Sequence, residues 1–197
     1  MIYPFSMCLI YLGIKIMKRN FYFFRHGQRN GIDVLSTLNK TGLAQANKLK
    51  EFFADKNIEA IYSSPLKRAV DTAKIAINNP DIEIITDDRL LETTFGFWYS
   101  NKDAMQQKIN ENFNRIKSCL DDILANDIHS NIAIASHGGV TRALCYACGQ
   151  EIGEIKPCEC FHFTLNDDNW ELVERFNTQI DGPNEYLEAR KISQIHD

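Results

Sequence analysis

Two short segments carry the residues best suited to chemistry, and each places a histidine just after an apolar run. The aromatic run of residues 21–24 leads into Arg25 and His26, and the run of residues 131–135 is followed two residues later by His137. Short apolar runs bounded by polar residues are typical of buried strands. In open α/β sheets, ligands bind at the edge where the strands end, so we expect the two imidazoles to meet there. A guanidinium beside an imidazole suits an anionic substrate, with the histidine as nucleophile or base.

A further cation comes from the segment between these two runs. Residues 63–68 read Ser-Ser-Pro-Leu-Lys-Arg, which indicates a strand passing into a helix. We expect Ser64 to cap this helix and Pro65 to occupy its first position, where the missing N–H costs nothing. Arg68 would then lie in the first turn, so that its charge and the free N–H groups of the helix face the same anion.

These segments, in this order, resemble the histidine phosphatase superfamily, which has the phosphoglycerate mutase-like fold. The matching segments cover most of residues 17–165 and are Arg25-His26-Gly27, residues 38–46, residues 63–72, Leu91-Glu92 with Phe95-Gly96, and Ser136-His137-Gly138-Gly139. The resemblance implies a single α/β domain with a mostly parallel central sheet, helices on both faces and a small lid. It also implies a hydrolase, a phosphatase that works through a phosphohistidine.

The expected site residues follow from what phosphoryl transfer requires: a nucleophile, positive charge around the phosphoryl oxygens and a proton for the leaving oxygen. We expect His26 to be the nucleophile. Arg25 and Arg68 would bind the phosphate and keep His26 neutral by like-charge repulsion. His137 would donate a hydrogen bond to the phosphate from the opposite side. Because the arginines supply the positive charge, we expect no metal ion and no cofactor.

The resemblance assigns the proton donor to Glu92. Partial burial under Phe95 and Trp98 would raise the pKa of this carboxyl group and let it hold a proton. It could then act as the base on water in the second half-reaction. Asp87 and Asp88 lie close in sequence and are the alternatives for this role.

The chain departs from the family pattern directly after the first histidine. Many members read Arg-His-Gly-Glu-Thr-x-x-Asn, whereas here Gln28 and Arg29 follow the glycine and Ile32 stands in place of the asparagine. Arg-His-Gly-x-Arg is similar to the branch with the ecdysteroid-phosphate and tyrosine-phosphate phosphatases, which would make Arg29 another arginine on the phosphate; a solvated loop cation is the alternative. Asn30 and Gly138 complete the expected substrate contacts.

The segment after Glu92 is short, which favours a phosphatase over a mutase. A mutase must retain its intermediate and reorient a bisphosphate, which requires a larger closing lid. Two alternatives stay open: a phosphoglycerate mutase-like phosphotransferase, and a phospho-ligand-binding protein without turnover.

The composition of the chain limits the number of domains, the kinds of partner and the state of the cysteines. A chain of 197 residues with 44% hydrophobic residues suits one domain with a substantial core. The net charge of −4 argues against nucleic-acid binding, and we expect a small phosphorylated partner, no membrane association and a cytoplasmic location. Six cysteines are too few for a disulfide scaffold and indicate reduced thiols. A metal site at Cys145, Cys148, Cys158, Cys160 and His162 is the alternative, although this spacing matches no zinc pattern well.

Two segments bracket the expected domain. We expect residues 1–16 to be an N-terminal extension that is either foreign to the native protein or disordered, and residues 17–197 to form the histidine phosphatase domain. Residues 2–14 are apolar but shorter than the roughly 20 residues a spanning helix needs. A weak membrane anchor is the alternative for this extension.

The elements that must position the site are read from hydrophobic periodicity. The expected strands are residues 20–24, 58–62, 82–85 and 132–135, followed by a hairpin of residues 158–165 and 170–176. The expected helices are residues 38–55, the helix after Ser64, residues 103–126 (one helix or two) and residues 140–148. In the first helix, Asn39 is the expected N-cap and Leu43, Ala46, Leu49 and Phe53 the buried face. Residues 93–101 are aromatic-rich and are expected to form the lid.

Overall fold

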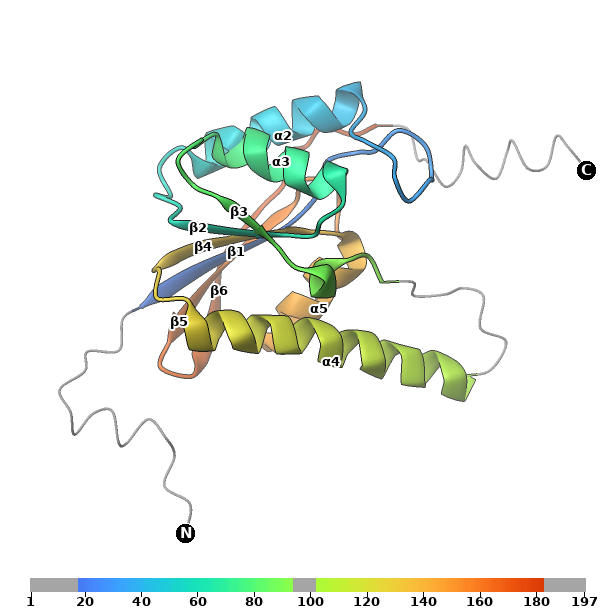
Figure 1. Ribbon diagram of the computed structural model, residues 1–197, viewed down its shortest axis with the longest axis vertical. Coiled ribbons are helices and arrows are strands. Elements are labelled where there is room, and N and C mark those ends of the chain that lie inside the picture. Colours follow the sequence, from blue (N-terminus) through green and yellow to red (C-terminus); the bar gives the residue numbers. More distant parts are fainter. Residues whose placement is uncertain (1–17, 94–101, 183–197) are drawn as a thin grey trace, which may run out of the picture.

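A six-stranded sheet lies between two layers of helices in the computed structural model, which describes residues 18–93 and 102–182 (Figure 1). The strands are β1 (Arg19–Arg25), β2 (Ala60–Ser63), β3 (Ile84–Thr86), β4 (Asn131–Ser136), β5 (Cys160–Asn166) and β6 (Asn169–Phe176). The helices are α2 (Lys40–Phe53), α3 (Lys67–Ile77), α4 (Lys102–Asn126) and α5 (Gly138–Ala147), with a 3₁₀ helix at Asp88–Leu90.

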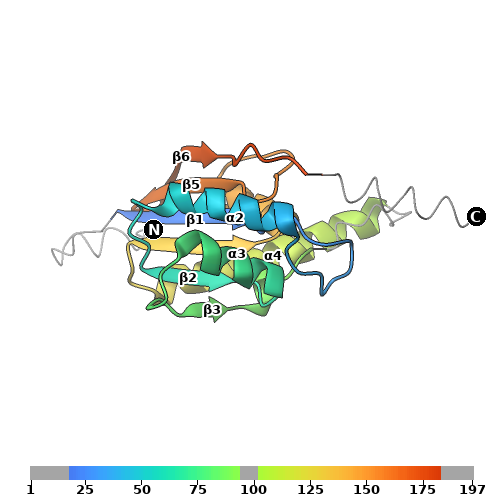
Figure 2. The same cartoon turned by 90° about the horizontal axis from the view of Figure 1, so that it is seen from above.

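The strand order is β3-β2-β4-β1-β5-β6 (Figure 2). The first four strands of this order are parallel, and β5 and β6 form an antiparallel hairpin along one edge. The predicted α/β fold with a mostly parallel sheet is therefore confirmed, as is the C-terminal hairpin. Strand β4 comes late in the chain but lies between β1 and β2, and this insertion brings the two His-Gly segments together.

Strand β1 divides two hydrophobic cores. Phe21 and Phe23 point to the face covered by α4 and α5, and Tyr22 and Phe24 point to the face covered by α2 and α3 (Figure 1), because side chains alternate along a strand. All four rings are buried. A strand covered on both faces reads as a continuous apolar run, which is what residues 21–24 show. Burial of each ring stabilises the fold by about 1.5–3 kcal/mol.

Helix α2 begins as predicted but turns a different face to the core. The side chain of Asn39 caps it by accepting the N–H of Gly42 at 2.8 Å. The prediction that Leu43 belongs to the buried face is wrong, since this side chain is 43% exposed. The helix approaches the loop after β1 so closely that a Cβ on Gly42 would lie 2.0 Å from the carbonyl oxygen of Gln28. Gly42 must face this loop, so Leu43 points away from it.

Helix α3 begins later than predicted. Its N-cap is Leu66 and its first residue is Lys67, so the prediction that Ser64 caps the helix with Pro65 at its first position is wrong. The Ser64 hydroxyl instead accepts the N–H of Leu66 at 3.3 Å and lies 2.8 Å from Nε2 of His137. Arg68 nevertheless stays in the first turn of α3, as expected.

The remaining elements lie within about two residues of their predicted positions. Residues 102–126 form one continuous helix, which settles the choice between one helix and two. Within residues 18–93 and 102–182, no helix is both long and apolar enough to cross a membrane. The predicted N-terminal extension, and the predicted lid beyond Thr93, lie outside the described residues.

Candidate active site

The carboxyl ends of three parallel strands lie side by side, and a candidate site residue follows each of these strands. Arg25 pairs with Ser136, and Ser63 pairs with Ala135, so the ends of β1, β4 and β2 are level. The next residues are His26, His137 and Ser64. Two main-chain hydrogen bonds extend the pairing beyond the strands: the N–H of His26 donates to the Ser136 carbonyl at 2.9 Å, and the N–H of Ser64 to the Ala135 carbonyl at 3.0 Å.

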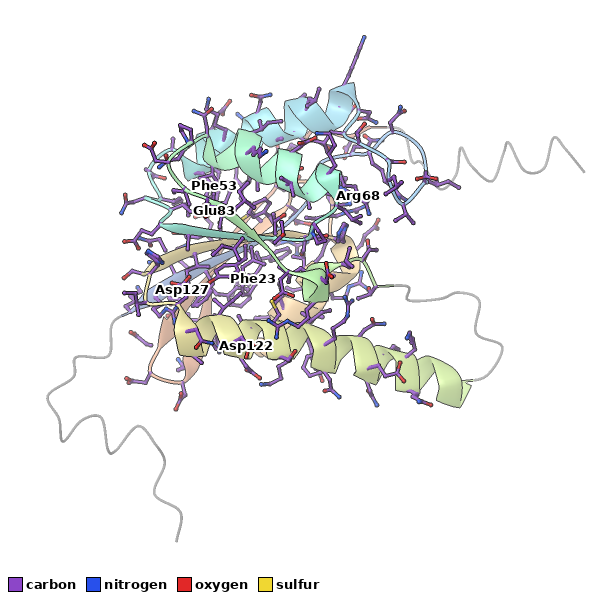
Figure 3. The ribbon with its side chains drawn as sticks, in the orientation of Figure 1. Phe23, Phe53, Arg68, Glu83, Asp122 and Asp127 are labelled. Atoms are coloured by element: carbon purple, nitrogen blue, oxygen red, sulfur yellow. The ribbon has the colours of Figure 1, made fainter. Side chains whose placement is uncertain are left out.

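The buried guanidinium of Arg68 joins these strand ends from the first turn of α3 (Figure 3). Its Nε donates to Nε2 of His26 at 3.1 Å, and its Nη2 lies 3.3 Å from Nδ1 of His137. Its Nη1 donates to the carbonyl of Val34 at 2.5 Å. The structure thus brings together His26, Arg68 and His137, three of the residues singled out in the sequence.

The contacts of His26 select one neutral tautomer. Its Nδ1 lies 2.6 Å from the carbonyl oxygen of Gly27, which can only accept, so Nδ1 carries the proton. The lone pair is then on Nε2, where Arg68 donates. Burial lowers the pKa of His26 well below its usual value, and His137, Arg25 and Arg68 lower it further by like-charge repulsion. A neutral imidazole with its Nε2 lone pair directed at the guanidinium of Arg68 is suited to nucleophilic attack on an anion.

The contacts of His137 favour the opposite tautomer. Because Arg68 can only donate, Nδ1 of His137 accepts, and Nε2–H donates to the Ser64 hydroxyl at 2.8 Å. Burial lowers the pKa of His137 to about 2, helped by Arg68 and Arg25. A hydroxyl can also donate, so Ser64 can pair with either tautomer of this histidine. His137 can therefore turn either a lone pair or an N–H toward the space beside Arg68.

Arg25 offers a donor that no described residue of the chain accepts. Its Nη1 donates to the carbonyl of Ile155 at 2.7 Å, but its Nε is buried and has no hydrogen-bond partner within the described chain. A buried donor without a partner carries a desolvation penalty of about 1–3 kcal/mol, which a bound anion would offset. Gly138, at the start of α5, lies against this side chain, since a Cβ placed on it would be 3.6 Å from Cδ and Nε of Arg25.

Glu92 approaches the same ring nitrogen of His137 that Arg68 contacts. Its Oε2 is 4.0 Å from Nδ1 of His137, and its Oε1 accepts the N–H of Thr93 at 3.0 Å. Although the side chain is 40% exposed, partial burial among protein groups raises the pKa of Glu92. The Thr93 N–H and the charges of Arg25 and Arg68 act in the opposite direction and moderate the rise. The predicted cover by Phe95 and Trp98 lies outside the described residues.

Asp87, an alternative candidate for the proton donor, forms an ion pair with Arg89. It accepts from the guanidinium of Arg89 at 2.7 Å, and this hydrogen bond lowers the pKa of Asp87. Its carboxylate is therefore stabilised in the charged form and is a poor proton donor. Glu92 remains the better candidate of the two.

Arg29 and Asn30 lie in the loop that follows the first histidine. Nη1 of Arg29 donates to the carbonyl of Asp33 at 3.2 Å, and its charge contributes to the low pKa of His137. The main-chain N–H of Asn30 donates to the carbonyl of Thr37 at 2.8 Å, and its side chain is exposed. Contact of these two residues with a substrate stays a prediction.

Sequence reasoning missed Arg115, on α4. Its Nη2 donates to the carbonyl of Leu91 at 2.9 Å, and its Nη1 to the carbonyl of Asp88 at 3.2 Å. Arg115 thereby holds the main chain that carries Glu92, and its charge contributes to the low pKa of His137. Nothing in the sequence distinguishes this arginine from the other cations of a long amphipathic helix.

The main chain directly after β1, which carries His26, is fixed by close packing. The N–H of Gly27 donates to Oγ1 of Thr72 at 3.0 Å, and this hydroxyl donates to the carbonyl of Arg68 at 2.7 Å. A Cβ on Gly27 would lie 2.6 Å from the carbonyl oxygen of Gly42, so a side chain there would push the loop off α2. One threonine thus ties the loop of the candidate nucleophile to the helix of the candidate phosphate ligand.

The cysteines do not form the alternative metal site. Among the residues described, no group of three or more His, Cys, Asp and Glu side chains is placed to hold a metal ion. Cys119, Cys145, Cys148, Cys158 and Cys160 are buried free thiols. Burial raises the pKa of Cys145 to about 12, which favours the neutral thiol.

Comparison with known proteins shows the family and the fold of the chain. The sequence profile of the histidine phosphatase superfamily (branch 1) matches residues 21–115. A protein of Hydrogenobacter thermophilus named "Putative phosphoserine phosphatase 2" is 30% identical over 158 residues, which are 65% of this chain and 77% of that protein.

The predicted phosphoglycerate mutase-like fold is confirmed by two solved structures. A mycobacterial glucosyl-3-phosphoglycerate phosphatase has a TM-score of 0.66 at 19% identity, over 79% of this chain and 97% of that one. A Bacillus anthracis phosphoglycerate mutase has a TM-score of 0.67 at 18% identity, over 80% and 92%.

Proposed function

The chain belongs to the histidine phosphatase superfamily, and from this we propose that it hydrolyses small phosphomonoesters through a phosphohistidine on Nε2 of His26. The observation that carries the choice of atom is the 2.6 Å contact between Nδ1 of His26 and the Gly27 carbonyl. This contact places the proton on Nδ1 and the lone pair on Nε2, beside Arg68. The mutase relative shares the fold, but phosphatase names among the relatives favour hydrolysis.

The first half-reaction transfers the phosphoryl group to the protein. Arg25 and Arg68 bind the phosphoryl oxygens. The Nε–H of Arg68, which donates to Nε2 of His26 before the substrate binds, then donates to one of these oxygens instead. Nε2 of His26 attacks phosphorus and the bond to the leaving oxygen breaks. Glu92 gives its proton to that oxygen, so the alcohol leaves neutral. The Nδ1–H bond to the Gly27 carbonyl holds the ring through the transfer.

The second half-reaction releases phosphate. Glu92, now a carboxylate, takes a proton from water while the water oxygen attacks phosphorus. The P–N bond breaks, Nε2 of His26 regains its lone pair and Glu92 regains its proton. Throughout, the arginines stabilise the charge on the phosphoryl oxygens, which is the main electrostatic demand of phosphoryl transfer.

The compartment is proposed from the cysteines. Cys119, Cys145, Cys148, Cys158 and Cys160 are free thiols. Reduced thiols are typical of the cytosol, so we propose a cytoplasmic enzyme.

The test is phosphate release from an aryl phosphate in the presence of a chelator, with wild type, His26→Ala and the control His129→Ala. His129 is about half exposed and lies before β4, at the end of the sheet away from the site. Wild type and His129→Ala are expected to turn over and to yield a trapped phosphoenzyme, and His26→Ala to do neither. Turnover by folded His26→Ala would place the nucleophile elsewhere. Isomerisation of phosphoglycerate without phosphate release would favour the mutase, and tight phosphate binding without any turnover would favour a binding protein.

A further inference from the structure

The connection between β1 and α2 contains an ordered loop, the 29–38 loop. Its base is closed by a bridge between Arg29 and Leu38, and the N–H of Asn30 donates to the carbonyl of Thr37 at 2.8 Å. Near its tip, the carboxylate of Asp33 accepts the N–H of Leu35 at 2.6 Å. These contacts give the loop a hairpin-like path with a defined tip.

The 29–38 loop is part of the candidate site. The carbonyl of Val34 accepts Nη1 of Arg68, whose other nitrogens contact His26 and His137. The guanidinium group of Arg68 therefore contacts both the tip of the loop and the two histidines. At the base of the 29–38 loop, the positive charge of Arg29 helps to lower the pKa of His137.

The tip of this loop is aliphatic and exposed to solvent. Ile32 is 55% exposed, Val34 65% and Leu35 78%. Single exposed aliphatic side chains are ordinary, but three within four residues, beside a cluster of charged and polar groups, form an apolar patch next to a polar site. Loop tips are more commonly occupied by Gly, Asn, Asp and Ser.

We propose that the aliphatic tip of the 29–38 loop binds the organic part of the substrate, and that the enzyme therefore prefers phosphomonoesters of an alkyl or aryl group over those of small polar alcohols. This inference rests on the proposed function, because Arg68 must hold the phosphoryl group. A phosphoryl group at Arg68 lies next to the Val34 carbonyl, so a chain of several carbons bonded to it reaches the tip. Covering Ile32, Val34 and Leu35 removes apolar surface from water both on the loop and on the substrate.

The experiment compares kcat/KM for a series of n-alkyl phosphates from ethyl to octyl. The variants are Ile32→Ser, Leu35→Ser and their combination. The control is Ile128→Ser, because Ile128 is an equally aliphatic and 84% exposed residue between α4 and β4, away from the site. Full burial of a methylene corresponds to about a fourfold gain, so kcat/KM should rise roughly two- to fourfold per methylene in wild type and in the control. In the loop variants the rise should flatten, most in the double variant.

Each outcome of this experiment decides the inference. A rise with chain length that flattens only in the loop variants supports it. Turnover that is independent of chain length, or a rise that the loop variants retain, overturns it and leaves the phosphatase activity intact. A change of oligomeric state in the loop variants, measured by size-exclusion chromatography, would identify the tip as a self-association surface and overturn it. Absence of turnover on every phosphomonoester overturns the proposed function and this inference with it.

Discussion

Nε of Arg68 donates to Nε2 of His26 over 3.1 Å, so the arginine proposed to hold the phosphate contacts the atom proposed as the nucleophile. We expect a phosphoryl oxygen that enters the site to accept the hydrogen bond of Arg68 in place of His26, because an anionic oxygen is a stronger acceptor than an imidazole nitrogen. The lone pair of His26 is then released at the moment the phosphoryl group arrives. In the proposed mechanism, one hydrogen bond thus couples phosphate binding to activation of the nucleophile.

Replacement of Arg68 should show that direction matters as well as charge. Lysine keeps the charge, but a point charge cannot supply three directed donors to His26, His137 and Val34. We expect Arg68→Lys and Arg68→Ala both to lower kcat/KM by about 10²–10³-fold. The control is Lys67→Ala, whose ammonium pairs with Asp71 on the surface, and which should stay within about twofold of wild type by the weak energetics of exposed pairs. An Arg68→Lys variant within tenfold of wild type would show that charge alone suffices.

The role of Glu92 should appear in the dependence on leaving group. An alkoxide needs a proton to leave, whereas nitrophenolate does not, so Glu92→Gln should lower kcat/KM by about 10²–10⁴-fold for alkyl phosphates and far less for p-nitrophenyl phosphate. Asp88→Asn is the control, since Asp88 is the exposed alternative acid. Equal losses on both substrates would assign Glu92 a structural role.

The same carboxyl group predicts a pH dependence. Partial burial raises the pKa of Glu92, and the proposed first half-reaction uses its protonated form. For alkyl phosphates, kcat/KM should therefore fall as pH rises through this raised pKa, and the fall should be absent in Glu92→Gln. Initial rates from pH 4 to 9 measure it. A basic limb that persists unchanged in the variant would belong to another group.

Arg115 is expected to position Glu92 rather than to touch the substrate. It donates to the carbonyls of Leu91 and Asp88, on the main chain that carries Glu92. Arg115→Ala should therefore lower activity by roughly 10–100-fold on alkyl phosphates and less on p-nitrophenyl phosphate, the same pattern as Glu92→Gln. Lys117→Ala, on the same helix and paired with Asp121, is the matched control. A loss that is equal for both leaving groups would contradict a role through Glu92.

The two buried histidines should make folding stability depend on pH. Both have folded-state pKa values far below the unfolded value of about 6.5, so their contribution is complete above that pH and declines as pH falls, when only the unfolded chain takes up protons. Each contributes a slope of about 1.4 kcal/mol per pH unit in this window. Urea unfolding between pH 6 and 4.5 should give a slope smaller by about that amount in His137→Gln than in wild type. Identical slopes would mean that His137 is protonated in the folded protein.

Much of the site could be predicted because its residues follow their strands directly. The runs before His26 and His137 are apolar enough to mark buried strands, and parallel pairing then brings the strand ends to one edge. The first turn of α3 supplies Arg68 even though the predicted start of this helix was wrong. Local sequence thus suffices where a residue's position is fixed by the element beside it.

The remaining features depend on contacts between distant parts of the chain. Arg115 reaches the main chain before Glu92 from another helix, and Arg68 binds the carbonyl of Val34, which any residue type would provide. The exposure of Leu43 follows from the contact between Gly42 and the loop after β1. Helical periodicity gives the spacing of a face but not its rotation about the helix axis.

The order β3-β2-β4-β1 has a consequence for synthesis of the chain. Because β4 separates β1 from β2, the strands that carry His26 and lead to Arg68 have no native partner in common until residues 131–136 are made. A chain still on the ribosome and ending before His137 therefore has exposed strand edges and no assembled anion site. Under the proposed function, phosphate binds only the assembled site, so its binding would mark the moment at which β4 enters the sheet and would stabilise the fold only after that step.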